Sequence, residues 1–154
     1  MKQFGALVIL MAVLAASADA RARDKNALIE LHHEIEGPAW KVWSLRLEPN
    51  GQIIEETWDW SSDRYHSERP RCTLTQVASE RALATSQQLL RSLPTTVDKG
   101  RPIPLDGPYK TLFVREGHEV RSSRWNMPED SNPSVETRAF ARAWEKIQAL
   151  LTCD

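Results

Sequence analysis

WKVWSLRLEPNGQIIEETWDW, residues 40–60, is the stretch that decides the fold of this chain. Two runs of alternating apolar and polar residues, 40–48 and 52–60, flank the sequence Glu48-Pro49-Asn50-Gly51. Alternation with a period of two indicates a half-buried strand, and a short turn-forming sequence between two such runs indicates a β-hairpin. We therefore predict two antiparallel strands joined by a tight turn.

The length of this turn decides which apolar side chains share a face of the sheet. The first run supplies Trp43, Leu45 and Leu47, and the second supplies Ile54, Trp58 and Trp60. A loop of even length places both sets on one face. A loop of odd length, with Pro49 in a type I turn and Gly51 in a left-handed bulge, places the two sets on opposite faces. We expect the even loop, because six apolar residues agree on it and one proline opposes it.

The segments on either side of the hairpin differ in pattern. Residues 26–35 alternate between apolar and polar side chains, which predicts a further strand that ends at Gly37-Pro38. Residues 61–73 are mostly polar, and we expect a loop there. The chain therefore begins its fold with three strands and a loop.

The second half of the chain carries helical spacing and a second hairpin. Pro94 ends the first helical pattern, and residues 94–108 hold four prolines and two glycines, so we expect irregular structure there. Glu116-Gly117 separates two further strand patterns, and Asn132-Pro133 supplies a cap residue followed by a proline at the first helical position. The expected elements are a helix from Thr73 or Thr75 to Leu93, strands at 110–115 and 118–125, and a helix from Pro133 to about Leu151.

These elements predict an α+β fold. Their order is three strands, a helix, two strands and a helix, so strands and helices come in blocks. We expect an antiparallel sheet of about five strands with both helices packed on one face. Without residues 1–20, the remaining 134 residues, 21–154, suffice for a single domain with one core.

Cys72 and Cys153 are the only cysteines of the sequence. A lone pair in an exported protein is most simply a disulfide. The alternative is a reactive or metal-binding thiol pair, but the two cysteines lack CxxC spacing. We therefore predict a Cys72–Cys153 disulfide that ties the two helices together.

The first 20 residues indicate export. Lys2 precedes an apolar run at 4–16, and Ala18-Asp19-Ala20 has the small-x-small pattern of a signal-peptide cleavage site. The run is shorter than the about 20 apolar residues that span a bilayer. We therefore predict cleavage near Ala20 and a soluble periplasmic or secreted protein without a membrane anchor. A net charge of -1 supplies no basic face, so we expect no nucleic-acid partner.

Two sets of residues suggest metal or glycosidase chemistry, but strand geometry opposes both. In Glu30-Leu31-His32-His33-Glu34, the neighbouring His32 and His33 point to opposite faces of a strand and cannot bind one ion together. Glu55 and Glu56 are also neighbours on a strand, so they cannot flank one glycosidic bond. We expect no cofactor and no metal ion.

The segment 59–66 holds the residue types of a hydrolase. A catalytic triad there could draw on Asp59 or Asp63, on His66, and on Ser61 or Ser62. The sequence contains neither GxSxG nor SxxK, and polar loops routinely contain such residues. A small extracytoplasmic hydrolase that uses this segment is therefore the alternative function.

Six tryptophans are many for a chain of this size, and four of them lie in the first hairpin. We expect Trp43, Trp58 and Trp144 in the core, because they fall on the apolar faces assigned above. The other two hairpin tryptophans lie at its open end, beside an Arg-Tyr-His sequence, and this composition is typical of interfaces. The predicted binding residues are Trp40, Trp60, Arg64, Tyr65 and His66.

Residues 106–117, DGPYKTLFVREG, precede a strand pattern and a leucine-rich terminal helix, and residues 89–94, LLRSLP, end the preceding helix. Over residues 74–151 this layout resembles that of the emfourin-type small proteins, a family that includes inhibitors of thermolysin-like metalloproteases. The resemblance implies a non-catalytic inhibitor or binder. The signal peptide, the cysteine pair and the tryptophan-rich hairpin depart from the family pattern, and we carry over no binding residue.

Export, the resemblance and the absence of an assembled catalytic motif favour a non-catalytic binding module, such as an inhibitor of a protease or toxin. We expect its partner to be another protein or a peptide. A cell-wall or glycan binder that uses Trp40 and Trp60 is a further alternative, because aromatic rings stack on sugar rings.

Overall fold

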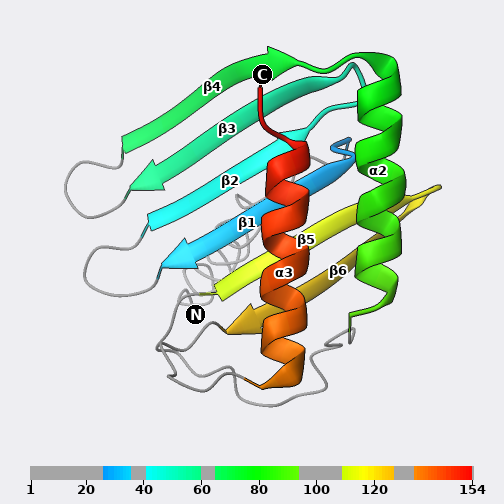
Figure 1. The fold of residues 1–154 in the computed structure, drawn as a ribbon. Helices are drawn as coiled ribbons and strands as arrows, with labels where there is room; N and C mark the ends of the chain where they lie inside the picture. The colour runs from blue at the N-terminus through cyan, green and yellow to red at the C-terminus, as the bar shows by residue number, and fades with distance from the viewer. Residues whose placement is uncertain (1–25, 36–40, 60–64, 94–108, 127–133, 154) are drawn as a thin grey trace, which may run out of the picture.

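The computed structural model of this chain describes residues 26–35, 41–59, 65–93, 109–126 and 134–153. These residues form one antiparallel sheet and two helices (Figure 1). The strands are β1 (Ile29–Ile35), β2 (Lys41–Leu47), β3 (Gln52–Asp59), β4 (Tyr65–Thr73), β5 (Tyr109–Glu116) and β6 (Glu119–Asn126). The helices are α2 (Gln76–Arg91) and α3 (Val135–Leu150).

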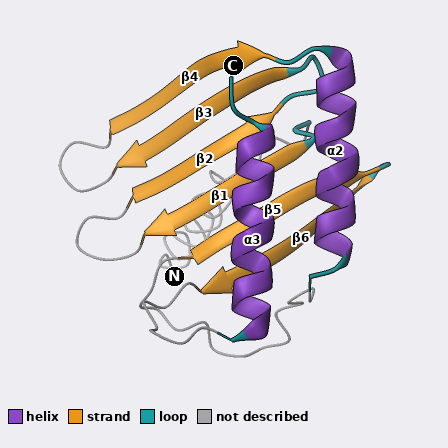
Figure 2. Ribbon diagram, in the orientation of Figure 1, coloured by secondary structure: helices purple, strands orange, loops and turns teal. Residues whose placement is uncertain are grey.

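The sheet has six strands in the order β4-β3-β2-β1-β5-β6. Both helices lie on the same face of this sheet, and they cross its strands side by side (Figure 2). The predicted α+β class, with an antiparallel sheet and two helices on one face, is confirmed. We call the opposite face, on which no helix of the described part lies, the helix-free face.

The sheet has one strand more than the sequence predicts, because residues 65–73 form β4 rather than part of a loop. β4 is an edge strand that pairs with β3 alone. Most of its side chains are exposed, so it needs no apolar alternation, and the lack of an N–H in Pro70 is tolerated on an edge. The polar composition that suggested a loop therefore reflects an edge strand.

The turn between β2 and β3 has the odd-length form, so our expectation of an even loop is wrong. Gly51 has a φ of 83° and donates its N–H to Glu48 O over 2.9 Å, while Glu48 N donates to Gln52 O over 2.9 Å. Leu47 pairs with Ile53, and Val42 pairs with Trp58. The left-handed glycine adds one residue to the turn, and Pro49 lies inside the turn where no N–H is needed.

The core lies between the sheet and the two helices. The sheet contributes Ile29, Leu31, Leu45, Leu47, Ile53, Leu112 and Val114, and the helices contribute Ala82, Leu90, Phe140, Ala143, Trp144 and Ile147. Trp144 is only 5% exposed, and Trp43 is half-buried. Their ring centroids lie 6.4 Å apart, as expected for core tryptophans. Trp58 was expected beside them, but the odd-length turn places it on the helix-free face.

Side-chain oxygens cap both helices. Thr75, one of the two predicted caps, accepts a hydrogen bond from Ala78 N at the start of α2. Ser134, rather than Asn132, caps α3 by accepting from Thr137 N over 3.1 Å. The last helix therefore begins two residues later than the sequence indicates.

The predicted disulfide is confirmed: Cys72 is bonded to Cys153. Cys72 belongs to β4 and Cys153 follows α3, so the bridge ties an edge strand to the terminal helix rather than one helix to the other. A disulfide is typical of a protein from an oxidising compartment.

The predicted signal peptide, residues 1–20, lies outside the described residues. Within the described ranges, neither helix has the length and apolar character needed to cross a membrane.

Candidate functional site

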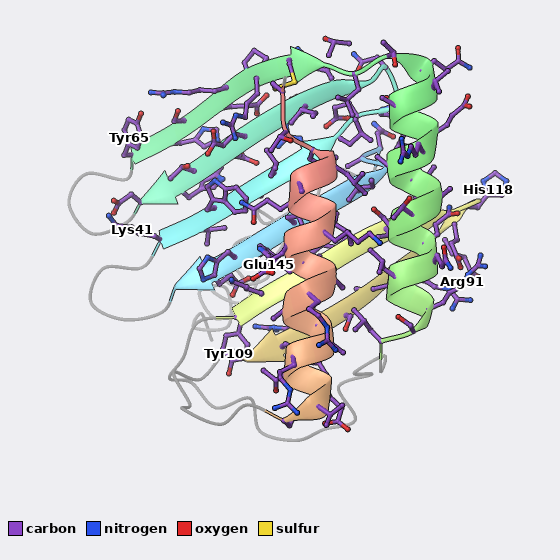
Figure 3. The ribbon with its side chains drawn as sticks, viewed as in Figure 1. Lys41, Tyr65, Arg91, Tyr109, His118 and Glu145 are labelled. Carbon is purple, nitrogen blue, oxygen red and sulfur yellow. A yellow bond between two sulfur atoms is a disulfide. The ribbon has the colours of Figure 1, made fainter. Side chains whose placement is uncertain are left out.

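Two of the five predicted binding residues lie in the described part of the chain. Tyr65 begins β4 and is 55% exposed (Figure 3). His66 follows it in the strand. Trp40, Trp60 and Arg64 lie outside the described residues.

The start of β4 carries a stacked aromatic pair. His66 lies directly opposite Trp58 in the β3–β4 register, and their rings stack with centroids 3.7 Å apart. Glu56 holds this pair in place: its Oε1 accepts a hydrogen bond from Trp58 Nε1 over 3.0 Å and lies 2.7 Å from His66 Nε2. Both rings are therefore fixed by stacking and by one carboxylate.

Arg46 on β2 links the carboxylates around this pair. Its Nε donates to Glu48 over 2.8 Å, its Nη1 donates to Glu56 over 2.8 Å, and its Nη2 lies 3.3 Å from Glu68. Glu56 and Glu68 are cross-strand neighbours, so the guanidinium offsets the repulsion between like charges. Burial opposes the charge of Arg46, but the carboxylates outweigh burial and raise its pKa.

We call Glu56, Trp58, Tyr65, His66 and Glu68, which lie near the start of β4, together the β4 end. Tyr65 pairs with Asp59 and points to the face of the sheet opposite to the other four side chains. Three of these residues, Glu56, His66 and Glu68, place one possible ligand atom each within 4.8 Å of the others, and such donors suit a divalent cation. Arg46 already supplies a positive charge to both carboxylates. We therefore interpret the cluster as an ion-pair network and assign no metal ion to it.

His32 forms a second charged cluster on the helix-free face. Its Nδ1 lies 3.5 Å from Glu30 and its Nε2 lies 3.0 Å from Glu34. Burial lowers the pKa of His32, but hydrogen bonds to the two glutamates outweigh burial and raise this pKa to about 9. A histidine with such a pKa stays protonated at neutral pH and is a poor general base.

His33 points to the other face, as the sequence predicts. Its ring lies 6.5 Å from that of Trp144 in a T-shaped arrangement, on the side of the helices. Burial and the nearby charge of Lys110 lower the pKa of His33. His32 and His33 therefore have opposite electrostatic environments and share no site.

The hydrolase hypothesis needs Asp59 or Asp63, His66 and a serine in one place. Asp59 pairs with Tyr65 in the sheet register and forms an ion pair with Lys41 over 2.9 Å. Since neighbouring strand residues alternate between faces, Asp59 and His66 point to opposite sides of the sheet. Ser61, Ser62 and Asp63 lie outside the described residues.

Glu55 and Glu56 also point to opposite faces, as predicted. Glu55 accepts a hydrogen bond from Trp43 Nε1 over 2.8 Å on the side of the helices, whereas Glu56 belongs to the network on the helix-free face. The two carboxylates do not flank a common space.

The binding site predicted from the sequence includes neither the stack of Trp58 on His66 nor the network around Arg46. The sequence contains a signal for the stack, because Pro49 and Gly51 favour the odd-length turn that moves Trp58 out of the core. No sequence signal identifies Arg46, since its partners come from β3, from β4 and from the residue that follows β2.

No protein-family model matches the sequence, and no curated protein matches it either. The resemblance of residues 74–151 to the emfourin-type proteins accordingly stays a prediction. We infer the function from the geometry of the β4 end.

Proposed function

We propose that this protein is an exported, non-catalytic binding module that recognises a protein partner through the β4 end. The observation that carries this proposal is the Trp58–His66 stack, with ring centroids 3.7 Å apart, on the helix-free face of an edge strand. The first residue of that strand, Tyr65, is exposed and points to the other face of the sheet. Tryptophan and tyrosine are enriched among the residues that dominate binding free energy at protein interfaces.

The rigidity of the β4 end supports a binding role. Trp58 and His66 are held by their stack and by Glu56, and Glu56 is held in turn by Arg46. Side chains that are fixed before association lose little conformational entropy on binding. The surface is therefore suited to a partner of complementary shape.

The same contacts argue against hydrolysis. A catalytic histidine needs a nucleophile within hydrogen-bonding distance and a third group that orients it. Glu56 does orient His66, but Asp59, from the hydrolase hypothesis, is bound to Lys41 on the other face. His66 therefore serves better as a contact residue than as a base.

The partner class follows from three indications. The disulfide favours an oxidising compartment, and residues 1–20 have the sequence pattern of a signal peptide. The resemblance of residues 74–151 to emfourin-type proteins favours an inhibitor. We therefore propose a protease or a toxin outside the cytoplasm as the partner.

Affinity capture from the native envelope and extracellular fractions tests this function, with mass spectrometry to identify what is bound. We expect Tyr65→Ala to weaken capture by about thirtyfold, as the loss of an interface hot spot does. The matched control is Val120→Ala, an exposed apolar residue on the opposite edge strand, which should bind as the unchanged protein does. Both variants should keep the circular dichroism spectrum and the melting temperature.

Three results would contradict the proposal. The first is equal capture by Tyr65→Ala and by the unchanged protein. The second is binding to a glycan array with no protein captured, which favours the glycan binder. The third is a hydrolytic activity that disappears in His66→Ala, since a binding protein should lose only affinity through that change.

A further inference from the structure

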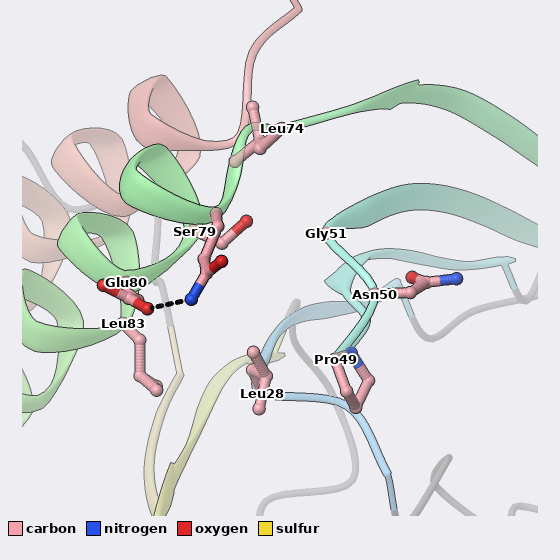
Figure 4. Close-up of a pocket in the computed structure, with 9 residues that line it drawn as sticks. Leu28, Pro49, Asn50, Gly51, Leu74, Ser79, Glu80 and Leu83 are labelled. Atoms are coloured by element: carbon pink, nitrogen blue, oxygen red, sulfur yellow. Dashed lines mark hydrogen bonds between the residues drawn. The ribbon is translucent and has the colours of Figure 1, made fainter.

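A pocket of about 370 Å³ lies at the other end of β3 from the β4 end, between the first turns of α2 and the β2–β3 turn (Figure 4). Three leucines, Leu28, Leu74 and Leu83, line it and also pack against the core, where each is only partly buried. Their outer surfaces give the pocket an apolar floor. We call this feature the α2 pocket.

The two walls of the α2 pocket are fixed to each other. Leu74 N, just before α2, donates a hydrogen bond to Gly51 O in the turn over 2.9 Å. A Cβ at Gly51 would lie 2.7 Å from Leu74 O and 3.2 Å from Ser79 Oγ, so the turn approaches the helix closely. The pocket is therefore preformed, which lowers the entropic cost of filling it.

The helix wall carries one carboxylate. Glu80 is exposed, and its Oε1 accepts a hydrogen bond from Gln76 Nε2 over 2.9 Å. In the described part of the chain no cation pairs with Glu80. The partial positive charge of the helix N-terminus falls off within the first turn, and Glu80 lies beyond that turn.

Ser79 also lines the pocket and is buried, and its hydroxyl has no hydrogen-bond partner in the described structure. Because this oxygen is closed off from solvent, we assign it no contact with a ligand in the pocket. An apolar floor and a lone carboxylate at its rim together suit a ligand with an aliphatic stem and a cationic head.

We propose that the α2 pocket accepts a lysine or arginine side chain presented by a partner protein. The aliphatic stem lies on the three leucines, and the charged head pairs with Glu80, as long basic side chains bury their stems while their heads stay hydrated. This contact is separate from the β4 end and uses none of its residues.

The test is an NMR titration of the ¹⁵N-labelled protein with two probes, Nα-acetyl-lysine amide and Nα-acetyl-norleucine amide. The second probe keeps the straight aliphatic chain but lacks the charge. We expect the lysine probe to shift the amide signals of Gly51, Leu74 and Ser79 and to bind more tightly than the norleucine probe. Glu80→Gln should weaken lysine binding by about threefold, the range of an exposed ion pair.

The matched control is Glu145→Gln, which removes an exposed carboxylate from α3 and should leave lysine binding unchanged. Equal affinity for the two probes, or unchanged lysine affinity in Glu80→Gln, would overturn the cationic ligand. Absence of shifts at the pocket amides would overturn the site itself. Tyr65→Ala should not alter lysine binding, so failure of this proposal and failure of the β4-end proposal are distinguishable.

Discussion

At the scale of single residues, His32 and Arg46 are cations of the helix-free face that are each held among carboxylates. His32 lies between Glu30 and Glu34, and Arg46 contacts Glu48, Glu56 and Glu68. Both cations are largely removed from water, where ion pairs are screened less than at the surface. Removing one partner of such a pair leaves an uncompensated buried charge. We therefore expect the stability of this face to depend on pH.

His32 gives that dependence a definite direction. Its pKa is about 9 in the folded protein, above the value of 6.5 expected for an unfolded chain. The protonated ring therefore stabilises the fold fully below about pH 6.5, and this contribution is lost as the pH rises through about 9. We expect the free energy of unfolding to fall over this range, and to fall less in His32→Gln. Urea unfolding of both proteins at several pH values measures the difference, and equal falls would contradict the assignment.

At the scale of elements, the apolar alternation, the turn sequences and the helix stops correctly predict two hairpins and two helices. Each of these signals depends only on residues that are close together in the sequence, so a single sequence is enough to detect it. The β2–β3 register is not decided by alternation, because Pro49 and Gly51 set the turn length against the preference of six apolar side chains. β4 was missed because an edge strand with two exposed faces has no apolar period.

The disulfide joins two elements that are distant in the sequence. Cys72 and Cys153 are 81 residues apart, and a loop of that length gives about 4.5 kcal/mol of stabilisation in the chain-entropy model. We expect the double variant Cys72→Ser/Cys153→Ser to unfold at a clearly lower urea concentration with its fold retained. Serine at both positions is the appropriate change, since a single variant leaves a free thiol. An unchanged unfolding midpoint would contradict this expectation and would mean that the core contacts of α3 hold this helix in place without the bridge.

At the scale of the whole molecule, the two faces of the sheet have different roles. The helices cover one face (Figure 1) and bury the core. The other face carries the charged networks and the Trp58–His66 stack. Of the predicted site, Tyr65 and His66 are exposed at the start of β4, next to aromatic and charged neighbours. The sequence could not identify Arg46 as a member of this site, because its surroundings depend on the register of three strands. For Trp58 the sequence does carry a signal, namely the turn residues Pro49 and Gly51.

The central claim is that the β4 end contacts a protein partner, and hydrogen exchange tests it most directly. The measurement compares amide exchange in the protein alone and in complex with its captured partner. We expect the partner to slow exchange at residues 65–69 of the edge strand β4 and at residues 56–59 of its neighbour β3. Slowed exchange confined to α2, α3 or β6, with residues 65–69 unchanged, would contradict the account.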